Sequence, residues 1–299
     1  MGEGTGHGKV ILFGEHFVVH GAPAIAGGIA NKAIVKVDKA NENKIITKMV
    51  VVPDMSLGGI NAVIESMNIK EKYHVHLTGD LPTYGGLGSS AAFCVGMVRA
   101  FADEKKLKLT DEQINKHAYD GEKAFHGNPS GVDNTIATYG GIAEYIRGNA
   151  SNENRLTFLK PKKTLDIVIA FSGKYSETAK MVAGVQKLKD DDGEQFQQLL
   201  DEYLDIEAQG KKAIEDGSLE KIGILMNNNQ KLLSEIGVSN EKNDEINKIA
   251  IEEGALGAKV TGGGGGGCCI ALAKDQDHAK KIAVKLTEKK FDSFATSII

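Results

Sequence analysis

The sequence has no tryptophan, five prolines and three cysteines among its 299 residues. The cysteines Cys94, Cys268 and Cys269 lack CxxC spacing, so we expect small buried thiols rather than disulfides or a zinc or redox site. No apolar run approaches the ~18 residues that a membrane span requires. The first residues also lack the charged head and apolar core of a signal peptide. We therefore expect a cytoplasmic protein that has no membrane partner.

The charge balance argues against nucleic acid as a partner. The formal net charge is −4, whereas a nucleic-acid surface requires a broad basic stripe. Apolar residues make up 41% and charged residues 25%, which is enough to build a soluble core. The length allows one large or two ordinary domains.

The order of apolar patterns predicts an α+β protein with two lobes. Strands are expected over 9–13, 33–37, 45–52 and 73–77, followed by helices over 91–106 and 110–127. A polar stretch over 147–163 predicts a hairpin or a domain boundary. Beyond it we expect a strand over 165–171, helices over 176–254, strands over 258–261 and 268–273, a helix over 278–288 and a last strand over 291–296. Strands and helices in separate blocks are typical of the α+β class.

Glycine is abundant, with 36 residues, and it is clustered. One cluster lies in the stretch GGLGSSAA over 85–92, directly before an expected helix. Backbone N–H groups at such a helix start can bind a phosphate, but an ordinary Ser-capped helix start explains the stretch equally well. A dinucleotide fingerprint is weak, because a Pro-containing loop precedes the glycines and a helix, not a strand, follows. A Walker A loop is excluded because no Lys follows the glycines.

Two carboxylates lie eleven residues apart, Glu122 near a helix end and Asp133 in the loop GNPSGVDN. Phosphoryl transfer needs an oxygen ligand for Mg²⁺ and a carboxylate facing the acceptor hydroxyl, and one rigid corner could supply both. From spacing alone, a helix cap at Asp133 and a solvated Glu122 are the better explanation.

Two further segments carry unusual residues. Lys9 begins an apolar strand, where a lysine needs an anionic partner, and Glu15 and His16 follow in the next turn. A lone histidine such as His16 is more often structural than catalytic. The six consecutive glycines Gly262–Gly267 exceed what a hairpin requires. They indicate either close approach to a ligand or to the first glycine loop, or a floppy connector.

Taken together, these segments resemble the GHMP kinases, which include galactokinases, homoserine kinases, mevalonate kinases and phosphomevalonate kinases. Three motifs appear in the family's order: GKVILFGEHFVVHG, LPTYGGLGSSAA and KVTGGGGGGCCIAL. Within the family, GEHFVVHG, GEKAFHGNPSGVDN and SETAKMVAGV are most similar to the branch that phosphorylates mevalonate. The resemblance spans almost the whole chain, from about Lys9 to the last strand.

The resemblance implies ATP and Mg²⁺ as cofactors and mevalonate as the acceptor, through its 5-hydroxyl. It implies catalytic roles for Asp133, which takes or orients the hydroxyl proton, and for Lys9 beside it. The magnesium ligands are expected to be Ser90 and Glu122. The residues implied to bind ATP are Gly85, Gly86, Leu87, Gly88, Ser89 and Ser90, and those implied near the substrate are Glu15, His16, Thr178 and Gly264.

The implied fold has two lobes. A GHMP kinase N-terminal domain that resembles ribosomal protein S5 domain 2 is expected over 1–160 and carries the ATP loop. A ferredoxin-like C-terminal domain with a helical insert is expected over 161–299. The long helices between Glu194 and Glu235 offer a surface for pairing in a homodimer.

The chain departs from the family pattern at two positions. His7 stands where the family usually has Pro, and Gly263 stands where it usually has Ala. Neither change removes a chemical group that the reaction uses. Two alternatives remain: a related kinase for phosphomevalonate, another mevalonate hydroxyl or a sugar, and a catalytically silent nucleotide-binding regulator.

Overall fold

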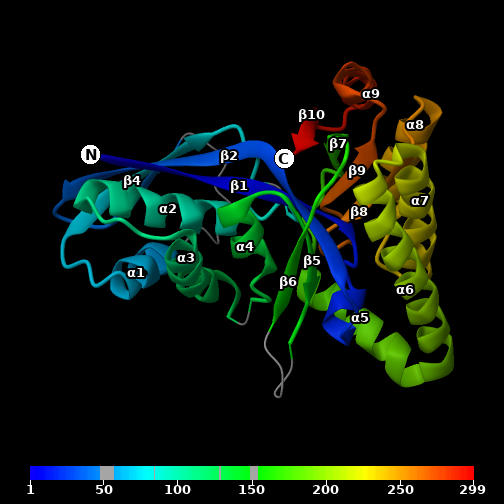
Figure 1. The fold of residues 1–299 in the computed structure, drawn as a ribbon, viewed down its shortest axis with the longest axis horizontal. Helices are drawn as coiled ribbons and strands as arrows, with labels where there is room; N and C mark the ends of the chain where they lie inside the picture. Colours follow the sequence, from blue (N-terminus) through cyan, green and yellow to red (C-terminus); the bar gives the residue numbers. More distant parts are fainter. Residues whose placement is uncertain (48–56, 84, 128, 149–153) are drawn as a thin grey trace. The chain divides into compact units, whose positions relative to one another are not determined.

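The computed structural model describes residues 1–47, 57–83, 85–127, 129–148 and 154–299. The chain forms two compact units, whose elements are labelled in Figure 1. The first unit consists of Met1–Lys9, Gly28–Thr83 and Leu87–Gly140, and the second of Val10–Gly27, Tyr84–Gly86 and Gly141–Ile299. Each unit combines helices with β-sheet, as expected for the α+β class. The predicted domains, 1–160 and 161–299, stay a prediction about where independently folding parts begin and end.

The first unit has a sheet built from the first part of β1 (Gly2–Phe13), the later part of β2 (Ala24–Ala40), β3 (Lys44–Thr47) and β4 (Lys72–Gly79). The strand order is β3-β4-β2, and β1 also pairs with β2. β2 and β4 run antiparallel, whereas β3 and β4 run parallel. The strand predicted over 45–52 is described only as far as Thr47, and the rest lies outside the described residues.

Four helices belong to the first unit: α1 (Leu57–Ser66), α2 (Ser89–Lys105), α3 (Asp111–His126) and α4 (Val132–Tyr139). The predicted capping box at the start of α3 is present, since the Thr110 side chain accepts from the Gln113 N–H and the Gln113 side chain bonds the Thr110 N–H. α2 lies against both α3 and α4. α2, α3 and α4 thus form one packed group.

β1 begins earlier than the sequence analysis predicted, because alternate glycines form one face of the strand. A Cβ on Gly2 would lie 2.1 Å from the Ala100 carbonyl oxygen, and one on Gly6 would lie 2.1 Å from the Ala92 carbonyl oxygen. Both acceptors belong to α2. The bare strand face therefore lets α2 approach the sheet closely, and Lys9 extends the same strand.

The second unit has a hairpin, β5 (Ile142–Ile146) and β6 (Arg155–Leu159), where the polar stretch predicted one. Its antiparallel strands follow the order β10-β7-β9-β8: β10 (Ser293–Ile298), β7 (Leu165–Phe171), β9 (Cys268–Leu272) and β8 (Gly257–Thr261). The helices are α5 (Thr178–Asp191), α6 (Gly193–Asp216), α7 (Leu219–Glu235), α8 (Glu241–Glu252) and α9 (Gln276–Glu288), and a short 3-10 turn, η1, spans Phe17–His20.

Side chains of α7 bond to β8, the last strand of this order. The Asn227 side-chain oxygen accepts the Ala258 N–H, and the Gln230 side-chain oxygen accepts the Val260 N–H, each at 2.9 Å. α7 and α8 both pack on β8, and α9 packs on β7 and β10. α6 and α7 pack against each other within this unit (Figure 1). Helix side chains thus satisfy strand amides that a further strand would otherwise pair.

The cysteines are free and buried, as predicted. Among the described residues, no helix combines the length and apolar character needed to cross a bilayer.

Candidate active site

The first unit holds a buried lysine paired with a carboxylate. Lys9 Nζ lies 3.2 Å from Asp133 Oδ1, and the Lys9 side chain is 5% exposed against 33% for Asp133. The Lys9 backbone N–H donates to the Leu87 carbonyl at 2.9 Å. The lysine is thus joined to the ATP-loop segment through its backbone and to Asp133 through its ammonium group.

The α3–α4 corner fixes the position of Asp133. α4 begins at Val132 with Gly131 as its N-cap, so the reading of Asp133 as a helix cap is wrong. The next residue, Asn134, donates from its side chain to the Asn115 side-chain oxygen at 2.6 Å. These bonds join α4 to α3 and leave the Asp133 carboxylate, in the first turn of α4, facing Lys9.

Glu122 is buried, so the reading of it as a solvated helix residue is also wrong. Its Oε1 atom is buried and has no hydrogen-bond partner among the described residues. Burial, and after it the negative charge of Asp133, raises the pKa of Glu122 to about 8. A hydrogen bond from Ser90 and the charge of Lys9 act in the opposite direction. The charged form of this carboxylate therefore needs a cation near it.

His126 is a neighbour of this group that the sequence analysis missed. Its Nε2 atom is hydrogen-bonded to Ser90 Oγ at 3.1 Å and lies 4.0 Å from Glu122 Oε2. The signal was available, because residues four apart on a helix share a face and His126 follows Glu122 by four. The imidazole holds the Ser90 hydroxyl beside the Glu122 carboxylate.

The loop over 85–90 leads into α2 without a side-chain cap. Gly88 is the N-cap, in the left-handed conformation with φ of 66°, and as a glycine it has no side chain with which to cap the first N–H groups of the helix. The Ser89 hydroxyl instead donates to the Pro82 carbonyl at 2.7 Å. A Cβ on Gly88 would lie 2.8 Å from Lys9 Cγ, so the Lys9 stem lies directly against this turn. An uncapped helix start attracts anions through its N–H groups and its dipole. Tyr84, which begins the loop's second-unit segment, lies outside the described residues.

The second unit contains the residues expected near the substrate. Glu15 is ion-paired with Lys259, and both side chains are fully buried. His16 Nε2 is hydrogen-bonded to the Gly263 carbonyl at 2.9 Å. Burial lowers the pKa of His16, against the effect of that hydrogen bond, so a neutral imidazole is favoured.

The six-glycine segment is held by hydrogen bonds, so the reading of it as a floppy connector is wrong. The Gly265 N–H donates to the Val238 carbonyl at 2.8 Å, and the Gly267 N–H donates to the Lys174 carbonyl at 2.7 Å. The buried Asn243 side chain donates to the Gly266 carbonyl at 3.1 Å. Gly264 has φ of 67° and packs so closely that a Cβ would lie 2.3 Å from the Val238 oxygen.

The first glycine loop approaches this segment within the second unit. A Cβ on Gly262 would lie 2.7 Å from Gly86 Cα, and one on Gly86 would lie 2.9 Å from the Thr261 carbonyl oxygen. Gly85 has open space around it, with the Ser176 backbone nitrogen 3.9 Å from an added Cβ. The approach between the two glycine segments, one of the explanations offered for the glycine run, is present in the structure.

Gly263 also makes room for Thr178, the exposed first residue of α5. A Cβ on Gly263 would lie 2.3 Å from Thr178 Oγ1 and 2.7 Å from Ser176 Oγ. Glycine at this position therefore leaves room for these two hydroxyls, which an Ala side chain would crowd. The other departure, His7, hydrogen-bonds the Ile29 carbonyl at 3.2 Å.

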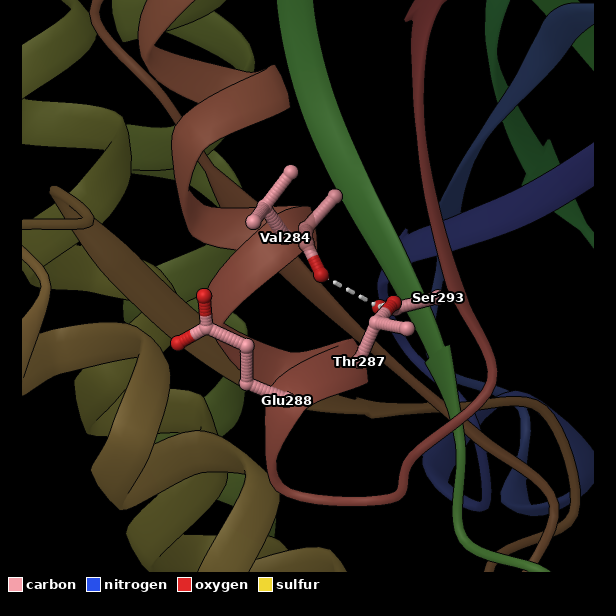
Figure 2. A pocket seen from close by; sticks show the side chains of 5 residues that line it. Val284, Thr287, Glu288 and Ser293 are labelled. Carbon is pink, nitrogen blue, oxygen red and sulfur yellow. Dashed lines mark hydrogen bonds between the residues drawn. The ribbon is translucent and has the colours of Figure 1, made fainter.

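A pocket between α9 and β10 contains none of the predicted residues. It is lined by Ala283, Val284, Thr287, Glu288 and Ser293. The Thr287 and Ser293 hydroxyls are hydrogen-bonded at 2.9 Å, and the Ser293 hydroxyl also donates to the Ala283 carbonyl at 2.7 Å. Figure 2 shows these two side chains together with Val284 and Glu288 around the pocket. The Glu288 carboxylate pairs with Lys285 at 2.9 Å and the hydroxyls bond each other, so we do not take this pocket as the candidate active site.

Comparison with known proteins decides the family. Residues 56–141 match the GHMP kinases N terminal domain, and residues 211–292 match GHMP kinases C terminal. The chain belongs to the GHMP kinase family. This GHMP kinase is 32% identical to a mevalonate kinase from Pyrococcus furiosus over 93% of this chain and 91% of that protein.

Solved structures agree with the family assignment. The crystal structure of L. major mevalonate kinase in complex with R-mevalonate has a TM-score of 0.93 and 34% sequence identity, covering 100% of this chain and 96% of that one. The Methanococcus jannaschii mevalonate kinase has a TM-score of 0.81 and 26% identity, covering 99% and 98% of the two chains. The predicted α+β GHMP kinase fold is confirmed, and membership implies an ATP-dependent kinase.

Proposed function

We propose that this GHMP kinase transfers the γ-phosphoryl group of ATP to the 5-hydroxyl of (R)-mevalonate, giving 5-phosphomevalonate and ADP. The observation that carries the proposal is the Lys9–Asp133 pair, which lies in the same unit as Ser90, Glu122 and the uncapped start of α2. The similarity to mevalonate kinases over 93% of the chain favours mevalonate as the acceptor.

In this mechanism Asp133 accepts the proton of the acceptor hydroxyl as the oxygen bonds to phosphorus. Lys9 contributes a positive charge beside that oxygen and the transferring group, whose negative charge is spread over its oxygens. The N–H groups at the start of α2 bind the phosphates of ATP. Most of the rate enhancement in such transfers comes from positioning and charge stabilisation, which these buried, bonded groups provide.

The donor set at the start of α2 fits Mg²⁺. The orphaned Glu122 Oε1 and the Ser90 hydroxyl are hard oxygen donors, which this ion prefers. Among the described residues no three His, Cys, Asp or Glu side chains gather as a metal cluster. A small donor set suits an ion that is usually held by one or two carboxylates together with substrate phosphates. When bound by Ser90 and Glu122, Mg²⁺ would neutralise charge on the phosphates.

Glu122→Gln is expected to raise the Mg²⁺ concentration for half-maximal activity by about 10- to 100-fold, because an amide binds the ion more weakly. A Mg²⁺ titration at saturating substrates measures the change. Glu112→Gln, at the exposed first turn of the same helix, is the matched control and should leave the titration unchanged. Identical curves for Glu122→Gln and the unchanged protein contradict the ligand role.

We propose that the acceptor contacts Glu15, His16, Thr178 and Gly264, which all belong to the second unit. Glu15 and His16 are held by Lys259 and Gly263, whereas Thr178 is exposed at the start of α5. Hydroxyl and imidazole groups suit the carboxylate and hydroxyls of mevalonate as hydrogen-bond partners.

A coupled ADP-release assay with mevalonate, phosphomevalonate and galactose tests the function. With ATP present, we expect mevalonate to be the one acceptor of the three that gives ADP release. Release with phosphomevalonate or galactose in its place would favour a related kinase. Nucleotide binding without ADP release from any of the three would favour the silent regulator and overturn the proposal.

We propose further that the enzyme acts in the cytoplasm, where its three buried free thiols stay reduced. A homodimer through α6 and α7 remains part of the proposal, and Leu204 and Ile224 are exposed apolar residues of these helices. Sedimentation equilibrium measures the oligomeric state directly.

A further inference from the structure

Lys259 is a fully buried lysine to which the reaction assigns no role. It lies in the middle of β8, where every residue is buried. Its ammonium group donates to Glu15 and to the Val260 carbonyl at 2.6 Å. Removing two charges from water costs several kcal/mol per ion, and well-packed apolar residues often stabilise a fold as well or better. A contribution to stability therefore does not explain well why an ion pair is present at this position.

The partner, Glu15, belongs to a segment that is joined to the third glycine motif at further points. The Thr261 hydroxyl accepts the Ile11 N–H at 2.9 Å and donates to the Ile11 carbonyl at 3.2 Å. His16 bonds the Gly263 carbonyl. Ile11, Glu15 and His16 are thus each bonded to a residue within 259–263. Among these contacts, the bond from Lys259 to Glu15 is the one between charged groups.

The same segment is held on another side by α6. The Phe17 ring stacks on the Tyr203 ring, with centroids 4.4 Å apart and planes 5° apart. The Tyr203 hydroxyl donates to the Pro23 carbonyl at 2.6 Å. The turn around Glu15 and His16 is therefore held on two sides, and Lys259 pairs with the Glu15 carboxylate within it.

We propose that Lys259 is a positioning residue, which acts through Glu15 to fix the Glu15–His16 segment against the third glycine motif for acceptor binding. The inference rests on the proposed function, because it takes Glu15 and His16 to contact the acceptor. Lys259 itself touches neither substrate nor ATP in this scheme. Its removal would take one positive charge from beside the buried Glu15 carboxylate, which favours a turn of that side chain or uptake of a proton.

The test compares three variants: Lys259→Met, Glu15→Gln and the double variant. We expect Lys259→Met to raise the KM for mevalonate by about 10- to 100-fold, as small displacements of positioned groups do, while the KM for ATP stays within about twofold. Because Lys259 acts through Glu15, the KM for mevalonate of the double variant should be no higher than that of Glu15→Gln alone. The double variant also removes both charges, so it is expected to fold even if Lys259→Met does not.

Lys211→Met is the matched control. Lys211 pairs with Glu144 at 2.9 Å in the same unit, on α6 and β5, so its ammonium group bonds a carboxylate outside residues 11–17. Its loss should lower the melting temperature slightly and leave the KM for mevalonate unchanged. A merely structural Lys259 would likewise leave the KM for mevalonate unchanged.

Hydrogen exchange gives a readout that does not depend on mevalonate. Lys259→Met, or the double variant, should lose amide protection over both 11–17 and 262–267, while Lys211→Met keeps it. Unchanged protection overturns the inference whatever the substrate proves to be. Lost protection without a change in the KM for mevalonate also overturns it. So does a KM for mevalonate that is higher in the double variant than in Glu15→Gln. If the unchanged protein does not phosphorylate mevalonate, the proposed function fails, and the exchange result still decides whether Lys259 holds the segment.

Discussion

Asp133→Asn is expected to lower kcat by roughly 10²–10⁴-fold, the usual contribution of a positioned acid or base. The amide has nearly the same shape as the carboxylate but cannot take the hydroxyl proton. The bonds between α3 and α4 that hold this corner do not involve the Asp133 side chain, so the geometry should persist. ATP binding, measured by equilibrium titration, should remain near that of the unchanged protein.

Asp120→Asn provides the matched control for this prediction. Asp120 also lies in the first unit, but it forms a surface pair with Lys123 at 2.9 Å. Exposed pairs contribute about 0–1 kcal/mol, so turnover should not change. Near-normal kcat for Asp133→Asn, with Asp120→Asn equally active, would show that another group takes the proton.

Lys9→Met is expected to lower kcat by roughly 10²–10³-fold, comparable with the loss of one preorganised donor to a developing charge. The methionine keeps the apolar stem that lies against Gly88 and removes the ammonium group beside Asp133. Single-turnover measurements at saturating ATP and mevalonate separate this loss from any loss of binding. Lys123→Met, which breaks the exposed pair instead, is the control and should be fully active.

The double variant Lys9→Met with Asp133→Asn gives a stricter test of the pair. Groups that act as a unit show strongly non-additive effects, so the double variant should be little slower than the slower single variant. Fully multiplied losses would mean that the two groups act on separate steps, which contradicts the proposed mechanism.

The sequence motifs predicted the family, the fold class and the pairing of Lys9 with an anion, because a lysine in an apolar strand requires one. Spacing alone misjudged Glu122 and Asp133. It placed Glu122 in solvent and Asp133 at a helix cap, since one sequence does not show that α2 covers the inner face of α3 or that Gly131 ends the loop. Tertiary packing decides both points.

Two other features were visible in the sequence but not interpreted. His126 lies one helical turn after Glu122, and Lys259 stands in an apolar strand just as Lys9 does. The alternation of glycine at the chain start was also missed as a strand, because glycine lacks the side chains by which strands are recognised. In each case the sequence contains the pattern but does not show which residues pack against it.

The Asn227 and Gln230 amides on α7 have a consequence beyond the site. A strand at the end of a sheet normally offers its free amides as a template for another polypeptide, which leads to aggregation or swapping. Here these side chains already occupy the Ala258 and Val260 donors. The strand that carries Lys259 therefore cannot pair with another polypeptide through these two amides. The same two bonds also hold β8 in place against α7.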